Sequence, residues 1–93
     1  MLNISFTNQY LKDLDLMKRR NLPKSELDVV VKLLVEEKPL PPKYKDHALK
    51  GDYIGYRECH VGGSGDWLLI YQKYKDKLIL LLTETGTHSD LFE

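Results

Sequence analysis

Three histidines and one aspartate are the side chains of this sequence best suited to catalysis: His47, His60, Asp66 and His88. Imidazole has an unperturbed pKa near neutrality, so two histidines that flank one phosphodiester can act as base and acid without a metal. Asp66 can orient a histidine or take a proton. In RNA the neighbouring 2′-hydroxyl attacks, so the protein has only to align it, move protons and stabilise the charged phosphorane.

Three further residues are candidates for binding such a substrate. Trp67 and Phe92 can supply stacking surfaces for unpaired bases. Arg57 can bind a phosphate, although strand alternation places it on the opposite face from His60. Each of these residues also has a structural interpretation, since a tryptophan is more often part of a core and a lone histidine more often a hydrogen-bonding structural residue.

A metal site and a cysteine nucleophile are both disfavoured by the sequence. The histidines lie 13 and 28 residues apart, and these separations match no compact zinc-ligand spacing. We therefore expect no metal and no cofactor. Cys59 and His60 are neighbours, but adjacent strand residues point to opposite faces, so we expect a buried, inert cysteine.

A predicted β-hairpin positions part of this candidate site. Residues 55–61 alternate as a strand does, the stretch from Gly62 to Gly65 is a turn signal, and a second apolar run begins at Trp67. A four-residue loop places Val61 opposite Asp66 and His60 opposite Trp67. An imidazole, an indole and a carboxylate then meet at one end of the hairpin.

The first half of the chain predicts one strand and two helices. Apolar residues alternate from Leu2 to Phe6, Thr7 is a suitable N-cap, and Phe6 can pack onto Leu11. The first helix presents an apolar stripe and ends near Asn21. Helical spacing then continues from Pro23, in the first turn of a second helix, to Lys38. The short link between the helices predicts an antiparallel helical hairpin, followed by an extended segment at residues 39–42.

The remaining chain completes an α+β fold of order β-α-α-β-β-β. Residues 74–76 form a second turn, and the uniformly apolar run from Leu78 to Leu82 predicts a central strand covered on both faces. The tail after Gly86 is long enough for one helical turn. A largely antiparallel sheet packed against the helical hairpin is the simplest arrangement.

Composition predicts a single small soluble domain spanning residues 1–93. Fourteen basic residues balance fourteen acidic ones, so net charge alone does not indicate nucleic-acid binding. The sequence has no signal-peptide pattern and no apolar run that approaches the roughly 20 residues that span a bilayer. The single cysteine suits a reducing compartment. We therefore expect a cytoplasmic protein with no membrane association.

Four segments taken together resemble the YafQ branch of the RelE-type toxins. They run in order with similar gaps and comprise Tyr44–Gly51 (YKDHALKG), Gly55–Val61 (GYRECHV), Asp66–Tyr71 (DWLLIY) and Thr85–Phe92 (TGTHSDLF). The first 40 residues match mainly in their element pattern.

The resemblance implies a RelE-like microbial RNase fold and the toxin of a type II toxin-antitoxin system. Such a toxin is a metal-independent endoribonuclease that enters the ribosomal A site, cleaves translated mRNA and is held inactive by a cognate antitoxin, here expected to be of the ribbon-helix-helix type. Contact with operator DNA is expected only through the antitoxin. The family's catalytic residues fall on His47, His60, Asp66 and His88, and its flanking aromatic residues fall on Trp67 and Phe92. His88 is then a proton-transfer group, while His47 and His60 bind or polarise the phosphate region.

Two departures from the family pattern support a rival interpretation. Glu84 stands where the family often has an arginine before Thr-Gly-Thr-His, and the chain is neutral where members are commonly basic. Both changes weaken attraction to RNA. The alternative is a protein of the same fold that acts by binding alone, as a toxin on another target or as a partner in a repressor complex. Retention of the three histidines favours the nuclease, and Glu84 favours the binder.

Overall fold

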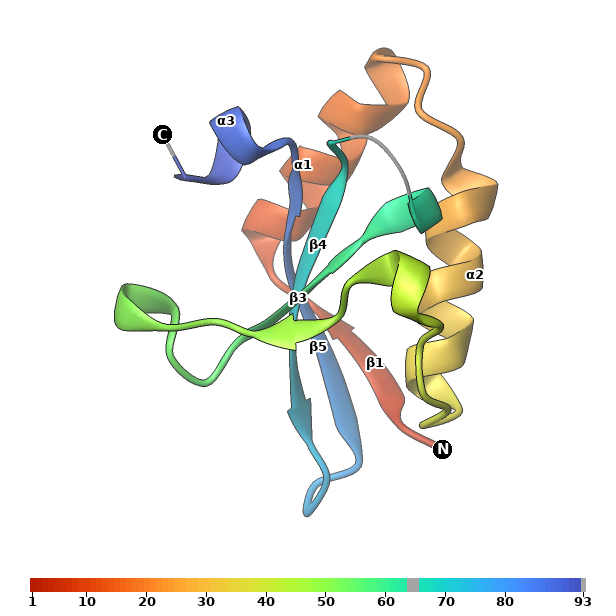
Figure 1. Cartoon of the computed structure of the whole chain (residues 1–93), viewed down its shortest axis with the longest axis vertical. Helices are drawn as coiled ribbons and strands as arrows, with labels where there is room; N and C mark the ends of the chain where they lie inside the picture. The colour runs from red at the N-terminus through yellow and green to blue at the C-terminus, as the bar shows by residue number, and fades with distance from the viewer. Residues whose placement is uncertain (64–65, 93) are drawn as a thin grey trace.

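Five strands form one sheet, and two helices pack on it (Figure 1). The computed structural model describes residues 1–63 and 66–92, with the side chain of Phe92 outside that description. The strands are β1 (Asn3–Phe6), β2 (His47–Ala48), β3 (Arg57–His60), β4 (Leu68–Tyr74) and β5 (Ile79–Gly86). The helices are α1 (Asn8–Arg19), α2 (Lys24–Val35) and α3 (His88–Phe92), and short 3-10 turns cover Pro42–Tyr44, Gly51–Tyr53 and Val61–Gly63.

The sheet order is β1-β5-β4-β3-β2, with β1 parallel to β5 and every other pair antiparallel. This confirms the predicted α+β class and the largely antiparallel sheet. The two-residue strand β2 was not expected. It carries His47 and adds a fifth strand at the edge beside β3.

Local signals set the ends of the helices as predicted, with small differences. The Thr7 hydroxyl accepts a hydrogen bond from the Tyr10 amide at 2.9 Å, and Asn21 adopts a left-handed φ of 61° after α1. Phe6 stacks on Tyr10, with ring centroids 5.6 Å apart, and not on Leu11, which is half-exposed. Pro23 is the N-cap of α2 and lies just before its first turn.

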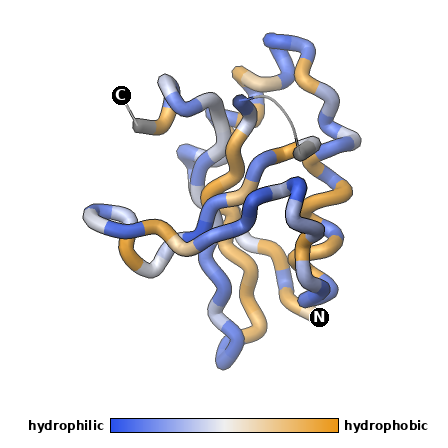
Figure 2. The backbone as a smooth tube through the Cα atoms, viewed as in Figure 1, coloured by the Kyte–Doolittle hydropathy of each residue, from blue (hydrophilic) through white to orange (hydrophobic). Residues whose placement is uncertain are grey.

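The core lies between the helices and one face of the sheet, where apolar residues of α2, β4 and β5 meet (Figure 2). The predicted double-sided burial belongs to β4, not to residues 78–82. Residues 68–71 are fully buried because β4 is the central strand. In β5, Leu80 and Leu82 are buried while Ile79 and Leu81 are partly exposed. Leu78 adopts a φ of 55° in the turn before the strand.

The first strand does not bury the face that its alternation predicted. Leu2 is buried, but Ile4 and Phe6 are 44% and 52% exposed, because β1 is an edge strand that the helices do not cover completely. Ile4 and Phe6 line an apolar groove that also includes Tyr10 and Val31.

The β3–β4 connection differs from the predicted four-residue turn by one position. His60 pairs with Leu68, and the Val61 amide donates to the Trp67 carbonyl at 2.8 Å. Ser64 and Gly65 of the predicted turn lie outside the described residues. A shift of one residue moves a side chain to the other face of the sheet, so Trp67 points into the core and not toward His60. No helix among the described residues has the length and apolar character needed to cross a bilayer.

Candidate active site

One row of paired residues crosses the sheet on the face that carries the histidines. His47 of β2 pairs with Glu58 of β3, Glu58 pairs with Ile70 of β4, and Ile70 pairs with Glu84 of β5. Directly paired residues of neighbouring antiparallel strands share a face. The sheet therefore brings together side chains that lie up to 37 positions apart along the chain.

His47 is held by contacts at both of its ring nitrogens. Its Nδ1 lies 2.7 Å from the Lys45 carbonyl oxygen, which requires a proton on Nδ1, and its Nε2 lies 3.6 Å from a carboxylate oxygen of Glu58. Glu58 is only 4% exposed. A carboxylate beside an imidazole stabilises the ring when it is protonated. Sequence reasoning missed Glu58, although its spacing of two from His60 in a strand predicts a shared face.

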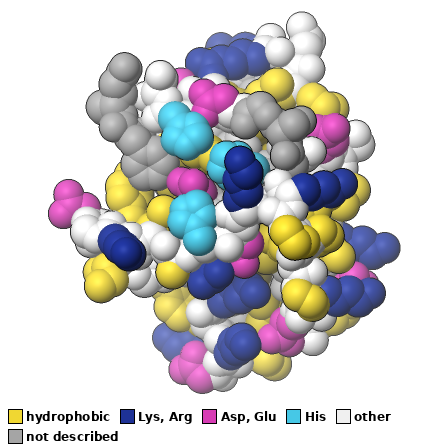
Figure 3. Space-filling view, in the orientation of Figure 1, with side chains coloured by type: hydrophobic (Ala, Val, Ile, Leu, Met, Phe, Trp, Pro, Cys, Tyr) yellow, Lys and Arg dark blue, Asp and Glu magenta, His cyan; other side chains and the backbone are white. Residues whose placement is uncertain are grey.

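His60, at the end of β3, and His88, at the start of α3, lie close together. Their ring centroids lie 5.9 Å apart with the planes inclined at 61°. One ligand atom from each of Glu58, His60 and His88 lies within 4.8 Å of the others. The three histidines are grouped on one side of the molecule with acidic side chains between and beside them (Figure 3). The structure therefore brings His47, His60 and His88 to one place.

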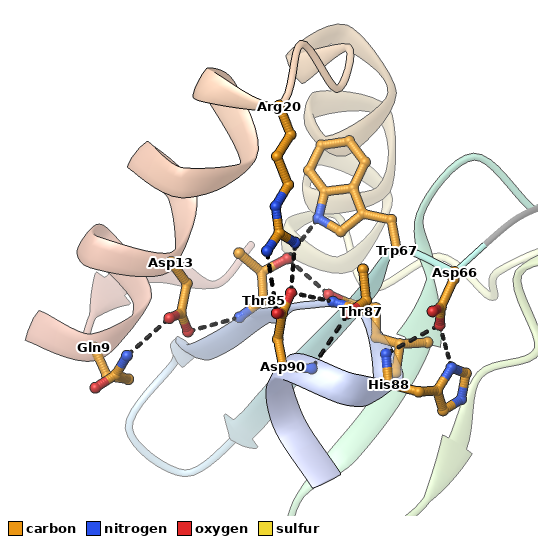
Figure 4. Close-up of polar contacts among 10 residues, drawn as sticks. Gln9, Asp13, Arg20, Asp66, Trp67, Thr85, Thr87, His88 and Asp90 are labelled. Atoms are coloured by element: carbon orange, nitrogen blue, oxygen red, sulfur yellow. Dashed lines mark hydrogen bonds and ion pairs between the residues drawn. The ribbon is translucent and has the colours of Figure 1, made fainter. Parts of the chain in front are cut away.

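Asp66 is attached to His88 by two hydrogen bonds. One carboxylate oxygen accepts the His88 backbone amide at 3.0 Å and also the ring Nδ1 of the same residue (Figure 4). These donors, the backbone amide first, lower the pKa of Asp66. In the neutral imidazole the proton is then on Nδ1, and Nε2 carries the lone pair that can accept a proton.

Trp67 lies in the core and does not present its ring to a base as predicted. The expected stacking surface is therefore absent at this position: Trp67 is only 5% exposed, and its Nε1 donates a 2.8 Å hydrogen bond to the Thr85 hydroxyl. Thr85 in turn donates to the Leu68 carbonyl at 2.7 Å. The shifted register explains this position, because Trp67 lies on the opposite face from His60.

Arg57 is not part of the histidine cluster. Its guanidinium donates to the Asp46 carboxylate at 3.1 and 3.4 Å, and Asp46 also accepts a hydrogen bond from the hydroxyl of Tyr71. The Asp46 hydrogen bond raises the pKa of Arg57. Strand alternation places Arg57 on the other face of β3 from Glu58 and His60, as the sequence indicated. Arg57 therefore supports the segment before His47.

The stacking role predicted for Phe92 is not tested, because the side chain of Phe92 lies outside the described residues.

Glu84 lies on the same face as the cluster, at the far end of the cross-strand row. It is half-buried, and burial together with the Asp13 carboxylate raises its pKa. Two strand spacings separate it from Glu58, which corresponds to about 10 Å. A negative charge at that distance opposes the approach of a phosphate.

The donors of the cluster are also compatible with a metal ion. Two imidazoles and one carboxylate suit Zn²⁺ or Cu²⁺, and their ligand atoms are close enough for joint coordination. The spacing argument against a metal therefore does not hold, because the fold brings β3 and α3 together irrespective of their separation in sequence. The prediction of a metal-independent site stays a prediction.

Comparisons with known proteins agree with this fold along the whole chain. The family model for the bacterial toxin of type II toxin-antitoxin systems, YafQ, matches residues 2–93. The "mRNA interferase toxin YafQ" of Escherichia coli K12 is 44% identical over 91 residues, which cover 97% of this chain and 95% of that protein.

Two solved structures extend the similarity. The E. coli DinJ-YafQ toxin-antitoxin complex matches with a TM-score of 0.87 and 39% identity, covering 99% of this chain and 98% of that one. A metal-bound toxin from Helicobacter pylori matches with a TM-score of 0.90 and 42% identity, covering 99% and 100%. The fold is that of a small bacterial toxin. The chain belongs to the YafQ family of type II toxin-antitoxin toxins.

Proposed function

We propose that this chain is an endoribonuclease toxin that cleaves mRNA and is neutralised by a cognate antitoxin. Membership of a toxin family whose E. coli K12 relative is named an mRNA interferase supports the reaction class. The observation that carries the proposal is the convergence of His60 and His88, 5.9 Å apart, with Asp66 bonded to His88. Two imidazoles at this separation can flank a single phosphodiester.

The geometry supports a reaction without a covalent enzyme intermediate. The ribose 2′-oxygen attacks the adjacent phosphorus as a base removes its proton, and the bond to the 5′-oxygen breaks as an acid protonates the leaving group. The products are a 2′,3′-cyclic phosphate and a 5′-hydroxyl end. His88, held by Asp66, exchanges a proton through Nε2, and His60 lies on the other side of the phosphate. His47, beside the buried Glu58, binds or polarises the phosphate region, as the resemblance to RelE-type toxins implies.

The substrate is mRNA in the ribosomal A site of the cytoplasm. The resemblance to RelE-type toxins supports this setting, and a ribosome compensates for the missing net positive charge by presenting the mRNA in a fixed position. The seven lysines and arginines between positions 43 and 77, against five acidic residues, provide a mild local attraction.

The antitoxin is a ribbon-helix-helix protein, and operator DNA is bound through it and not by this neutral chain. The apolar groove between β1 and the two long helices supports such a partner. Ile4 and Phe6 are about half-exposed there, beside Tyr10, Leu14 and Val31. An amphipathic partner segment that covers these residues removes apolar surface from water.

The decisive experiment maps mRNA ends after induction of the toxin in cells and on purified translating ribosomes. Wild type is expected to arrest growth and to produce new 5′-hydroxyl ends on translated mRNA. His88→Ala is expected to abolish both, and the ends should require ribosomes.

One observation favours the binding-only alternative, namely Glu84 on the face that would receive the phosphate. That alternative predicts growth arrest without new RNA ends and undiminished arrest by His88→Ala. Either result contradicts the nuclease proposal.

A further inference from the structure

His88 lies on a helix that is too short to hold itself in place. The five-residue α3 is far below the length at which an isolated helix is stable. A local cap defines where the helix begins, because the Asp90 carboxylate accepts the Thr87 amide at 2.9 Å and the Thr87 hydroxyl accepts the Asp90 amide at 3.2 Å. This cap fixes the first turn but not the direction of α3 relative to the sheet.

Arg20 links that turn to α1, 70 residues earlier in the chain (Figure 4). Its guanidinium donates to both Asp90 carboxylate oxygens, at 2.7 and 3.3 Å. Bidentate pairing fixes orientation as well as distance. The hydrogen bond from Arg20 is the largest cause that lowers the pKa of Asp90 to about 2. We refer to this pair as the Arg20–Asp90 clamp.

Helix α1 contacts the segment from Thr85 to Asp90 at both of its ends. The Asp13 carboxylate accepts the Thr85 amide at 3.2 Å, while Arg20, at the end of the same helix, holds Asp90. Asp90 packs closely against β5, since a Cβ added at Gly86 would lie 3.0 Å from the Asp90 Cβ. His88 lies between these two attachments, on the side where Asp66 accepts its hydrogen bonds.

We propose that Arg20, acting through Asp90, is a positioning residue that holds α3 so that His88 meets both Asp66 and the reacting phosphate. Arg20 lies outside the proposed catalytic set and its guanidinium is engaged by Asp90, so we expect it to act through α3. The inference rests on the proposed nuclease function, because positioning has kinetic consequences only where His88 transfers a proton.

The competing explanation is that Arg20 binds RNA directly. The two explanations differ for Asp90→Asn, which removes the partner charge and leaves the guanidinium intact. Direct binding predicts normal or tighter RNA binding by that variant. Positioning predicts that Asp90→Asn and Arg20→Met have the same defect.

The experiment measures ribosome-dependent cleavage by Arg20→Met, Asp90→Asn and the double variant. We expect kcat to fall about tenfold or more in each, with KM nearly unchanged, because small displacements of a catalytic group slow the chemical step. The double variant should be no slower than the singles, since both break one clamp. Arg20→Lys should recover part of the rate. Arg19→Met is the matched control, because Arg19 pairs with Asp15 on the exposed side of α1 and should retain the wild-type kcat.

A second measurement follows the His88 imidazole by NMR and does not depend on RNA cleavage. Its ring resonances should shift in Arg20→Met and Asp90→Asn and stay in place in Arg19→Met. Unshifted His88 resonances in folded Arg20→Met and Asp90→Asn overturn the inference. The inference is also overturned if only Arg20→Met is defective and its defect is a raised KM with an unchanged kcat. If wild type cleaves no RNA, the nuclease proposal fails, and the resonances still decide whether the clamp positions His88.

Discussion

The Asp66 carboxylate accepts both the backbone amide and the ring Nδ1 of His88, so one side chain fixes the position and the tautomer of the histidine. The two residues lie 22 positions apart and come from different elements, the loop before β4 and the start of α3. This pairing gives Asp66 an orienting role within the proposed nuclease site.

Asp66→Asn should slow cleavage without unfolding the protein. Asparagine is nearly isosteric and can still accept one hydrogen bond, but it no longer stabilises a protonated imidazole. We expect kcat to fall by about 10- to 100-fold, less than the roughly 100- to 10,000-fold that a general acid or base contributes, because Asp66 acts by orienting His88. Single-turnover cleavage measures this effect. Asp76→Asn, at the opposite end of β4, is the control, and equal losses in both variants would contradict the role of Asp66.

Glu58→Gln tests the buried partner of His47. Glutamine preserves the packing of a side chain that is 4% exposed but removes the negative charge beside the His47 imidazole. We expect the rate to fall several-fold, since the Glu58 carboxylate lies 3.6 Å from the His47 Nε2, close enough for electrostatic attraction but not for a hydrogen bond. Cleavage assays and a thermal melt measure activity and stability together. A variant with the wild-type rate would remove Glu58, and His47 with it, from the proposed mechanism.

Glu84→Arg should strengthen RNA binding. The substitution replaces a half-buried anion on the site face with a cation, and burial already raises the pKa of this carboxyl. A charge change of two near a phosphate at an effective dielectric of about 20 corresponds to roughly 1–2 kcal/mol after screening. We expect KM to fall several-fold at low salt, with an intermediate value for Glu84→Gln. Glu37→Arg makes the same charge change beyond the end of α2 and should have little effect.

Trp67→Phe distinguishes a core tryptophan from a stacking platform. Loss of the hydrogen bond to Thr85 and of buried ring volume should destabilise the fold by about 1–3 kcal/mol. Cleavage at a temperature where the variant is folded should change little. The matched control is Tyr74→Phe, whose surface hydroxyl bonds Gln72. A large activity loss with an unchanged melting temperature would restore the stacking role.

The Arg20–Asp90 clamp predicts a stability change in acid. The pKa of Asp90 is about 2 in the folded protein and about 4 when unfolded, so its stabilisation is full above pH 4 and declines as the pH falls toward 2. The pair is partly exposed, so solvent screening keeps its contribution small. Denaturant unfolding between pH 6 and pH 2 should show wild type converging on Asp90→Asn. A constant difference across that range would exclude the clamp as the cause.

The sequence by itself determined the element types other than the short strand β2, and it identified the three histidines and Asp66 as candidate residues. Helical spacing, the Thr7 cap and the break at Asn21 predicted α1 and α2 because these signals act within a few residues. The three histidines and Asp66 were recognisable from their chemistry, and four ordered motifs indicated the toxin family. Register was beyond local signals, since a one-residue shift at the β3–β4 connection moved Trp67 to the opposite face.

Tertiary structure decided which of these residues act together. Glu58 joined His47 only through pairing of β2 with β3, and Arg20 met Asp90 only because α1 ends beside α3. Arg57 lay apart from the histidines because it lies on the other face of β3. Such contacts depend on how strands and helices pack across long separations in sequence, where local propensity carries no information. The residue types of the site could therefore be read from the sequence, and their relative positions were set by tertiary packing.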